Sequence, residues 1–225
     1  MEMRTEVGPI QNTEENTGRT PQSREHDAKC KMKRILRGKQ KDQIEKDIVR
    51  YGKDILNSEE LQQAYRQTHH TWSTVGEHTI RVAAASLLIC YALRKIHVQT
   101  DISAVVEASL CHDLGILGRY EKYTSDKECM RQHPVDSVEV ARGLVDDLSE
   151  KSAGIIERHM WPAGHSKAPN SIEGVIVSTA DKYAALQDIV EGSAVKHTGV
   201  KIFARDLKSR TQAELAEFLS DWESA

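Results

Sequence analysis

Residues 108–115 read Ala-Ser-Leu-Cys-His-Asp-Leu-Gly, so an apolar, helix-compatible segment runs directly into a histidine beside an aspartate. Burial of an imidazole and a carboxylate is unfavourable unless each has a partner, and one divalent metal ion satisfies both. An isolated His-Asp pair is common in loops and as a satisfied pair in a core. Further ligating side chains are therefore needed before His112 and Asp113 indicate a metal site.

Such side chains lie on or beside other stretches with apolar periodicity. They are His78, His133, His159 and Asp181, and with the pair they give the order His, His-Asp, His, His, Asp. Imidazole nitrogen with carboxylate oxygen suits Mn, Fe, Co, Ni or Zn better than Ca, and the lack of cysteine ligands does not fit a structural zinc. The sequence thus predicts a divalent metal centre.

This order resembles the HD-domain superfamily of metal-dependent phosphohydrolases, over about residues 65–190. The resemblance implies a helical bundle in which a first metal is held by His78, His112, Asp113 and Asp181. In dinuclear members two intervening histidines hold a second metal. Here these would be His133 and His159, with the Asp113 carboxylate bridging the two ions.

The chemistry implied by the resemblance is hydrolysis. Two metals about 3.5–4 Å apart lower the pKa of a shared hydroxide toward about 7 and clamp the oxygens of a phosphoryl group during in-line attack. We therefore expect a phosphohydrolase that cleaves a phosphate ester of a nucleotide or small phosphorylated metabolite with a metal-activated hydroxide. Asp113 and Lys182 are the predicted catalytic residues.

Cationic side chains near the predicted ligands are candidates for substrate binding. Arg81 follows His78 by about one helical turn, so its side chain is expected at the mouth of the site. Arg119 and Lys122 follow the doublet, and Lys182 would bind phosphate or orient Asp181. For each of these side chains the alternative is an exposed surface charge.

Other histidines are expected to lie outside the site. His69 and His70 precede the first ligand helix, and lining of the pocket is the less favoured interpretation for both. His97 and His197 have no ligating neighbours in the sequence and are expected at the surface.

The sequence departs from the family pattern in two places. Many HD hydrolases carry a lysine three residues after the aspartate of the doublet, where this chain has Ile116. A phosphate-binding role would then pass to Arg119 or Lys122. The Gly-Tyr-Pro signature of the branch that hydrolyses cyclic-di-GMP is also missing, so this substrate is not expected. The His-Met-Trp-Pro segment at 159–162 is instead similar to small stand-alone bacterial HD proteins.

Two other function classes stay open. A branch of the superfamily uses the same six ligands in a di-iron oxygenase, which a mixed-valent iron pair would indicate. The other class is a non-catalytic regulatory or binding module, which is disfavoured because all six ligand positions are filled.

Composition limits the class of protein and its partners. The chain has 225 residues, of which 39% are hydrophobic and 29% charged, which fits one domain with appendages. The net charge of -3 disfavours nucleic-acid binding, and the longest apolar run, Val82–Leu93, is shorter than the about 20 residues of a membrane span. Four widely spaced cysteines and a polar N-terminus indicate a cytoplasmic protein. The expected partner is a small-molecule phosphate ester, with no membrane contact, and a homo-oligomer stays open.

Helical periodicity without long alternating runs predicts an all-α fold. The expected parts are a disordered, partly basic arm, a helical lead-in, the HD domain, and a C-terminal loop and helix, over residues 1–41, 42–70, 71–191 and 192–225.

Several helix ends can be assigned from the sequence. Ser73 or Thr74 is expected to cap one helix and Asp101 another, with Gly115 as the stop of the second. Pro134 is expected at a helix start. A terminal helix is expected over Thr211–Trp222. Loops at 118–132 and 161–169 are expected to line the substrate pocket.

Overall fold

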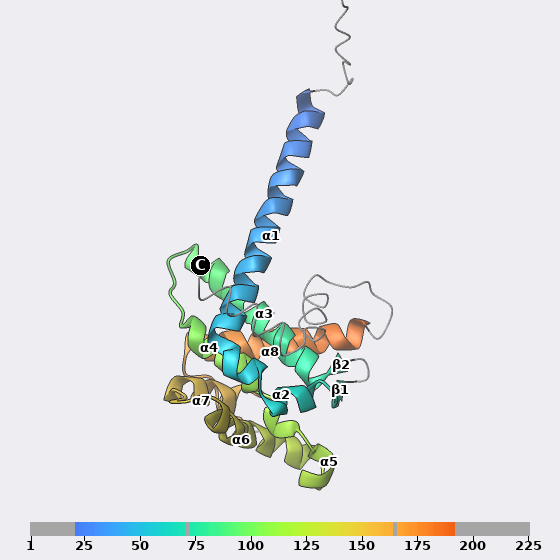
Figure 1. The fold of residues 1–225 in the computed structure, drawn as a ribbon, viewed down its shortest axis with the longest axis vertical. Helices are drawn as coiled ribbons and strands as arrows, with labels where there is room; N and C mark the ends of the chain where they lie inside the picture. The colour runs from blue at the N-terminus through green and yellow to red at the C-terminus, as the bar shows by residue number, and fades with distance from the viewer. Residues whose placement is uncertain (1–20, 71–72, 164–165, 192–225) are drawn as a thin grey trace, which may run out of the picture. The chain divides into compact units, whose positions relative to one another are not determined.

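The fold is almost entirely helical (Figure 1). The structure is a computed structural model that describes residues 21–70, 73–163 and 166–191, and side chains within 38–69, 73–163 and 166–187. The elements are α1 Pro21–Leu56, α2 Glu59–Ala64, β1 Thr68–His70, β2 Ser73–Thr74, α3 Val75–Arg94, α4 Ile102–Cys111, the 3-10 turn η1 Leu114–Ile116, α5 Arg119–Lys122, α6 Asp126–Leu144, α7 Glu150–Arg158 and α8 Ile172–Glu191. The predicted all-α class is confirmed.

Two compact units divide the chain after Lys41, and helix α1 crosses the division. The helix begins at Pro21, within the predicted arm, whereas residues 1–20 lie outside the described residues. Disorder of the arm and the boundaries of the other predicted parts stay predictions. The expected helix at Thr211–Trp222 also lies outside the described residues.

Helices that carry predicted ligands begin at capped residues. Thr74 Oγ1 accepts from the Glu77 N–H at 3.2 Å, and the Glu77 carboxylate accepts from the Thr74 N–H at 3.2 Å, which completes a capping box at α3. Asp101 and Ser149 cap α4 and α7 with side-chain oxygens on first-turn N–H groups. The predicted caps at Thr74 and Asp101 are confirmed. They fix where each helix starts and therefore which face its later residues occupy.

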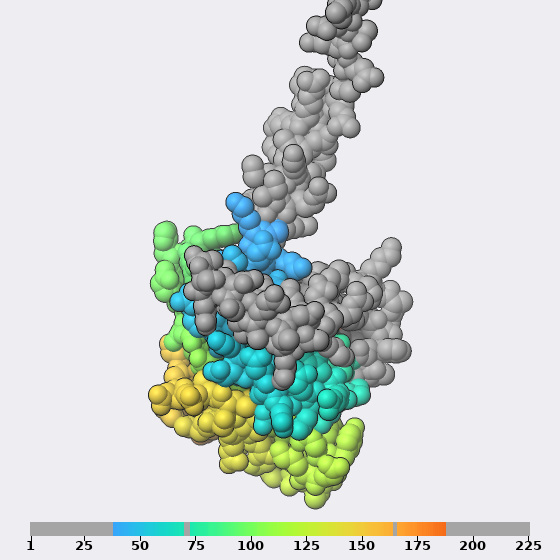
Figure 2. Space-filling view, viewed as in Figure 1, coloured from blue at the N-terminus to red at the C-terminus, as the bar shows by residue number. Residues whose placement is uncertain are grey.

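The core forms around α4. Its Val105, Val106, Ala108 and Leu110 are fully buried. Helices α3, α7 and α8 pack against α4, and α3 also packs against α8. In Figure 1 these helices lie together, with α5, α6 and α7 along one side. The surfaces of α2, α5 and α7 adjoin on one face (Figure 2). The ligand-bearing ends of α3 and α4 are thus enclosed by other helices.

Pro134 lies inside helix α6, and its predicted place at a helix start is wrong. The helix begins earlier because Ser125 accepts from the Glu128 N–H at 3.2 Å. A proline here removes one backbone donor, so the carbonyl four residues earlier, at Met130, has no helical partner at this position. The loop structure expected over 118–132 is also wrong, because α5 and the start of α6 occupy most of this segment. The segment does line a cavity as expected, with Arg119, Cys129 and Met130.

Gly115 does not end helix α4, which is a second correction. The helix ends at Cys111, and Gly115 lies in η1. A Cβ at this position would lie 2.4 Å from the backbone oxygen of His133 and 2.5 Å from the backbone nitrogen of Ser137. The glycine is therefore required by the close approach of η1 to α6.

A short hairpin, not expected from the sequence, ends the lead-in. Strand β1 pairs antiparallel with β2, with an irregular register between Thr68 and His70. The Gln67 side chain joins it to the segment after α4, by donating to the Ile116 carbonyl at 2.9 Å and accepting from the Gly118 N–H at 2.8 Å. The hairpin thereby fixes His69 near the end of α4.

Across residues 21–70, 73–163 and 166–191, no helix has both the length and the apolar character needed to cross a bilayer.

Candidate metal centre

Helices α3 and α8 bring the first predicted ligand and the last one together. His78 lies in the first turn of α3 and is fully buried, and its Nε2 lies 3.0 Å from Asp181 Oδ1 on α8. The two residues are 103 positions apart in the sequence. Their contact therefore results from the packing of α3 against α8.

His112 and Asp113 close α4 and turn into the same space. The His112 Nδ1 lies 2.8 Å from the Ser109 carbonyl oxygen. Its Nε2 lies 3.3 Å from Asp113 Oδ2 and 3.7 Å from Asp181 Oδ1. This Nε2 is buried and makes no hydrogen bond to the described residues. A buried nitrogen that faces two carboxylates in this way fits a cation between them.

His133 and His159 approach from the other side. His133 lies within α6 and His159 is the C-cap of α7. Their Nε2 atoms are 3.2 Å apart and lie 3.3 and 3.5 Å from Asp113 Oδ1, respectively. Two nitrogens bound to one metal at about 2.1 Å are about 3.0–3.4 Å apart when their bonds are near right or tetrahedral angles. The observed separation fits a shared ion.

Backbone carbonyls fix the protonation of these rings. The Nδ1 atoms of His133 and His159 lie 2.7 Å from the carbonyl oxygens of Cys129 and Ile156. A carbonyl oxygen can only accept, so each Nδ1 carries the hydrogen, and the same holds for His112. In the neutral rings the Nε2 lone pairs then point at the cluster. This is the tautomer that a metal at Nε2 requires.

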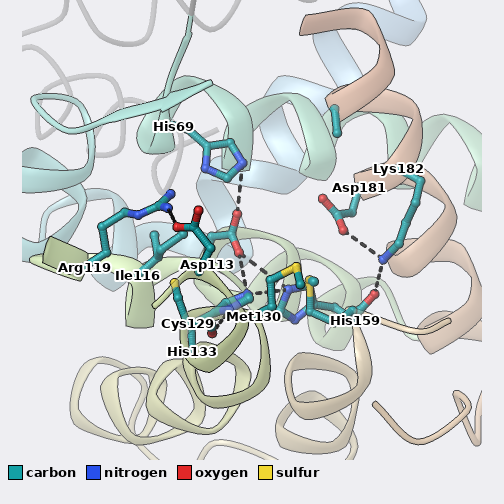
Figure 3. A pocket seen from close by; sticks show the side chains of 13 residues that line it. His69, Asp113, Ile116, Arg119, Cys129, Met130, His133, His159, Asp181 and Lys182 are labelled. Atoms are coloured by element: carbon teal, nitrogen blue, oxygen red, sulfur yellow. Dashed lines mark hydrogen bonds and ion pairs between the residues drawn. The ribbon is translucent and has the colours of Figure 1, made fainter. Parts of the chain in front are cut away.

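Asp113 lies between the two groups of histidines. Figure 3 shows its carboxylate between His69 and the pair His133 and His159. Its Oδ2 faces His112 at 3.3 Å and His78 at 3.8 Å, whereas its Oδ1 faces His133 and His159. The four predicted histidine ligands thus face the Asp113 carboxylate, and Asp181 lies beside two of them, His78 and His112. The buried cluster contains nitrogen and carboxylate oxygen donors alone, a set that fits a divalent transition metal.

The cluster also contains His69, for which the sequence disfavours a place in the pocket; that prediction is wrong. Its Nε2 lies 3.5 Å from Asp113 Oδ2, and its ring centroid lies 4.5 Å from that of His78. His69, His78 and Asp113 form one of the groups whose ligand atoms lie within 4.8 Å of one another. The sequence signal was weak, because a three-residue strand has no helical periodicity that assigns a face.

The histidines of the cluster favour the charged form of both carboxylates. Burial would raise the pKa of Asp113 and of Asp181, but the facing histidines hold both well below the usual range. Burial alone would lower the pKa of His112, yet the Asp113 charge raises it to about 10. Against the same effect of burial, hydrogen bonding to Asp113 raises the pKa of His133 to about 9. For His159 burial prevails and lowers the pKa. Protons on His112 and His133 therefore occupy positions that a metal would take.

A cavity of about 410 Å³ opens beside the cluster. Its lining includes Asp113, His133 and His159 together with two of the predicted cationic residues, Arg119 and Lys182 (Figure 3). A cavity of this size is in the usual range for small-molecule sites, about 300–1,000 Å³.

The cations in the cavity wall are already paired. Arg119 donates to Asp126 Oδ1 at 2.5 Å. Lys182 Nζ donates to the His159 carbonyl and, at 3.1 Å, to Asp181 Oδ2. Lys182 therefore connects a ligand of one side of the cluster to the backbone of the other.

Arg81 and Lys122 do not line this cavity. Arg81 is 2% exposed, so the expectation that it reaches the mouth of the site is wrong; its turn of α3 is enclosed. Lys122 Nζ donates to the Gly115 carbonyl at 3.0 Å and lies 3.7 Å from Asp136 Oδ2. These two contacts stabilise the segment that follows Asp113.

A comparison with family models agrees with this arrangement. The model described as HD domain matches residues 75–186. The matched segment begins at the first residue of α3 and ends within α8, so it includes the six predicted ligands and excludes His69. No match was found among curated proteins or among solved structures.

Proposed function

The chain belongs to the HD-domain superfamily, and on this premise we propose that it hydrolyses a phosphate ester of a nucleotide or a small phosphorylated metabolite. HD domains are commonly metal-dependent hydrolases. The observation that carries the proposal is the position of Asp113 beside a cavity: its two carboxylate oxygens face different groups of histidines.

Two ions fit this arrangement. His78, His112, Asp181 and Asp113 Oδ2 would hold one, and His133, His159 and Asp113 Oδ1 the other. When bound, such ions would lower the pKa of a water nucleophile and polarise phosphoryl oxygens. A single ion would leave one of the two facing sets of buried donors without a cation, which is unfavourable.

The protein's own residues supply orientation. The Nδ1–carbonyl hydrogen bonds of His112, His133 and His159 hold each ring with Nε2 toward Asp113. Lys182 keeps Asp181 and the His159 backbone at a fixed separation through Nζ. Because its side chain also lines the cavity, we assign Lys182 a second role in contacting a substrate phosphate.

The cavity wall favours a compact ester. Ile116 stands where many relatives are expected to have a lysine, and with Met130, Met160 and Ala185 it gives the wall an apolar part. Arg119 is the cation next in sequence that lines the cavity, and it would replace the absent lysine once it turns from Asp126 toward a phosphate. Apolar contact would then hold the organic group while the cations hold the phosphate.

The test is metal content and oxidation state of protein purified without added metal or oxygen, followed by phosphate release from a panel of esters with the metal found. Two equivalents of Mn, Co, Ni, Zn or Fe(II) and release of phosphate would support the proposal. A mixed-valent iron pair with no hydrolysis of any ester would overturn it in favour of the oxygenase. Absence of metal binding would favour the regulatory module.

A further inference from the structure

We propose that His69 is an additional ligand of the ion held by His78, His112, Asp181 and Asp113. This makes the two metal positions unequal, with one tightly bound ion and one exchangeable ion that carries the open positions for water and substrate. The inference rests on the proposed two-metal site. The inference goes beyond the proposed site because His69 lies outside the segment that matches the HD-domain model.

The geometry around one carboxylate oxygen carries the assignment. Three imidazole nitrogens surround Asp113 Oδ2, at 3.3 Å for His112, 3.5 Å for His69 and 3.8 Å for His78. The distance from His69 Nε2 to Asp113 Oδ2 thus lies between the corresponding distances of the predicted ligands His112 and His78. The His69 ring is tilted by 43° against that of His78 at a centroid distance of 4.5 Å, and an Nε2 atom of each ring faces Asp113 Oδ2. Figure 3 shows His69 beside Asp113.

His69 reaches the cluster from the side of the cavity. It lines the cavity, and its side chain is 11% exposed, whereas that of His78 is fully buried. A ligand added at this place would occupy a coordination position that otherwise faces the cavity. The ion on the Oδ2 side would thereby have one position fewer for water or substrate.

The strand that carries His69 is fixed relative to Asp113. Gln67, two residues earlier, makes both its side-chain hydrogen bonds to the segment that follows Asp113, at Ile116 and Gly118. The Gln67 carbonyl also accepts from the Val75 N–H at 3.0 Å, at the start of the helix that carries His78. These bonds connect His69 to the elements that supply its neighbouring ligands.

The two sides of Asp113 differ in donor number. Among the described residues, the Oδ2 side offers three imidazoles with Asp181, and the Oδ1 side offers two imidazoles. A site with few protein ligands keeps positions for water and substrate, as catalytic sites do. The Oδ2 side should therefore hold the tighter ion.

The experiment is a Co(II) titration of chelator-treated full-length protein, followed by calorimetry and visible absorption. The wild type should bind two ions with different affinities. His69→Asn should weaken the tighter step at least about tenfold, the loss that even an outer-shell partner produces. It should leave the weaker step within about twofold, and change the absorption of the first ion bound. His69→Asp, which keeps a ligand oxygen, should retain more of the tight affinity than His69→Asn.

His97→Asn is the matched control. His97 is exposed, and asparagine tolerates its positive φ of 63°. This variant should titrate as the wild type does. Far-UV circular dichroism of the chelator-treated variants identifies any variant that fails to fold. If His69→Asn fails to fold, the metal affinity of His69→Asp still tests the inference.

The outcomes separate the two proposals. Unchanged affinities in His69→Asn would overturn the inference and leave the proposed function standing, and a raised KM in that variant would make His69 a substrate contact. Loss of the weaker step alone would also overturn it, because His69 would then belong to the other ion. A wild type that binds no metal would overturn the proposed function itself.

Discussion

The two sides of Asp113 are built from different parts of the molecule. On the Oδ2 side, His78, His112 and Asp181 come from α3, α4 and α8, which pack on one another in the core. On the Oδ1 side, His133 and His159 come from α6 and the end of α7, which pack against each other. The Oδ2 half of the centre is therefore fixed by packing in the core, whereas the Oδ1 half depends on how closely α6 approaches η1.

The largest effect should come from the residue that both sides share. Asp113→Ala removes the carboxylate that faces every histidine of the cluster. It should abolish binding of both metals and any phosphatase activity. Elemental analysis measures the bound metal, and phosphate release measures the activity. Asp54→Ala, at an exposed aspartate, is the control and should keep both. Full metal content in Asp113→Ala would show that the site is wrongly assigned.

Removing one histidine on the Oδ1 side should separate the two halves. His133→Ala or His159→Ala should reduce the stoichiometry from two ions to one, because the ligands on the Oδ2 side are untouched. Metal analysis after dialysis gives the ratio. If the wild type and both variants each bind one ion, the centre is mononuclear; two ions in both variants would show that His133 and His159 are not needed for the second ion.

The pH dependence should distinguish metal-free from metal-loaded protein. The pKa of His112 is raised from 6.5 to about 10 and that of His133 to about 9. A raised folded-state pKa adds stability that is complete below about 6.5 and is lost as pH rises through about 9–10. Chelator-treated protein should therefore lose stability between pH 7 and 10, as measured by urea unfolding.

Metal binding requires the neutral rings, so it should release protons in the same pH range. Metal affinity should consequently rise with pH, and the metal-loaded protein should not show the loss of stability. Equal pH dependence with and without metal would contradict a role of His112 and His133 as ligands. Asp113 and Asp181 do not interfere, because their pKa values are lowered and they stay charged throughout.

The smallest effect should come from the approach of η1 to α6. Gly115→Ala would place a Cβ 2.4 Å from the His133 backbone oxygen, and overpacking of this kind costs about 1–3 kcal/mol. Urea unfolding should show this loss, and the ion on the Oδ1 side should bind more weakly than the other. Gly143→Ala in α6 is the control, because nothing lies within 4 Å of its added Cβ. Equal stability of the two variants would show that this approach is loose.

Local patterns predicted the helices well. Thr74 and Asp101 were identifiable as caps because a cap acts within one turn, and the apolar stripes of α3, α4, α7 and α8 follow a period that the chain itself carries. Pro134 and Gly115 were misread because each has two common roles. A proline fits a helix start and a glycine fits a helix stop, but the cap at Ser125 starts α6 before Pro134, and the close approach of α6 requires a glycine at position 115.

By itself the sequence determined the class of fold and the set of six candidate ligands, since residue type and helical spacing are local properties. Tertiary structure alone decided which oxygen of Asp113 each histidine faces, that His69 joins them, and that Arg81 is enclosed while Lys182 reaches the cavity. These outcomes depend on distances between elements far apart in the chain. Such distances follow from how the helices pack, which no short stretch of sequence specifies.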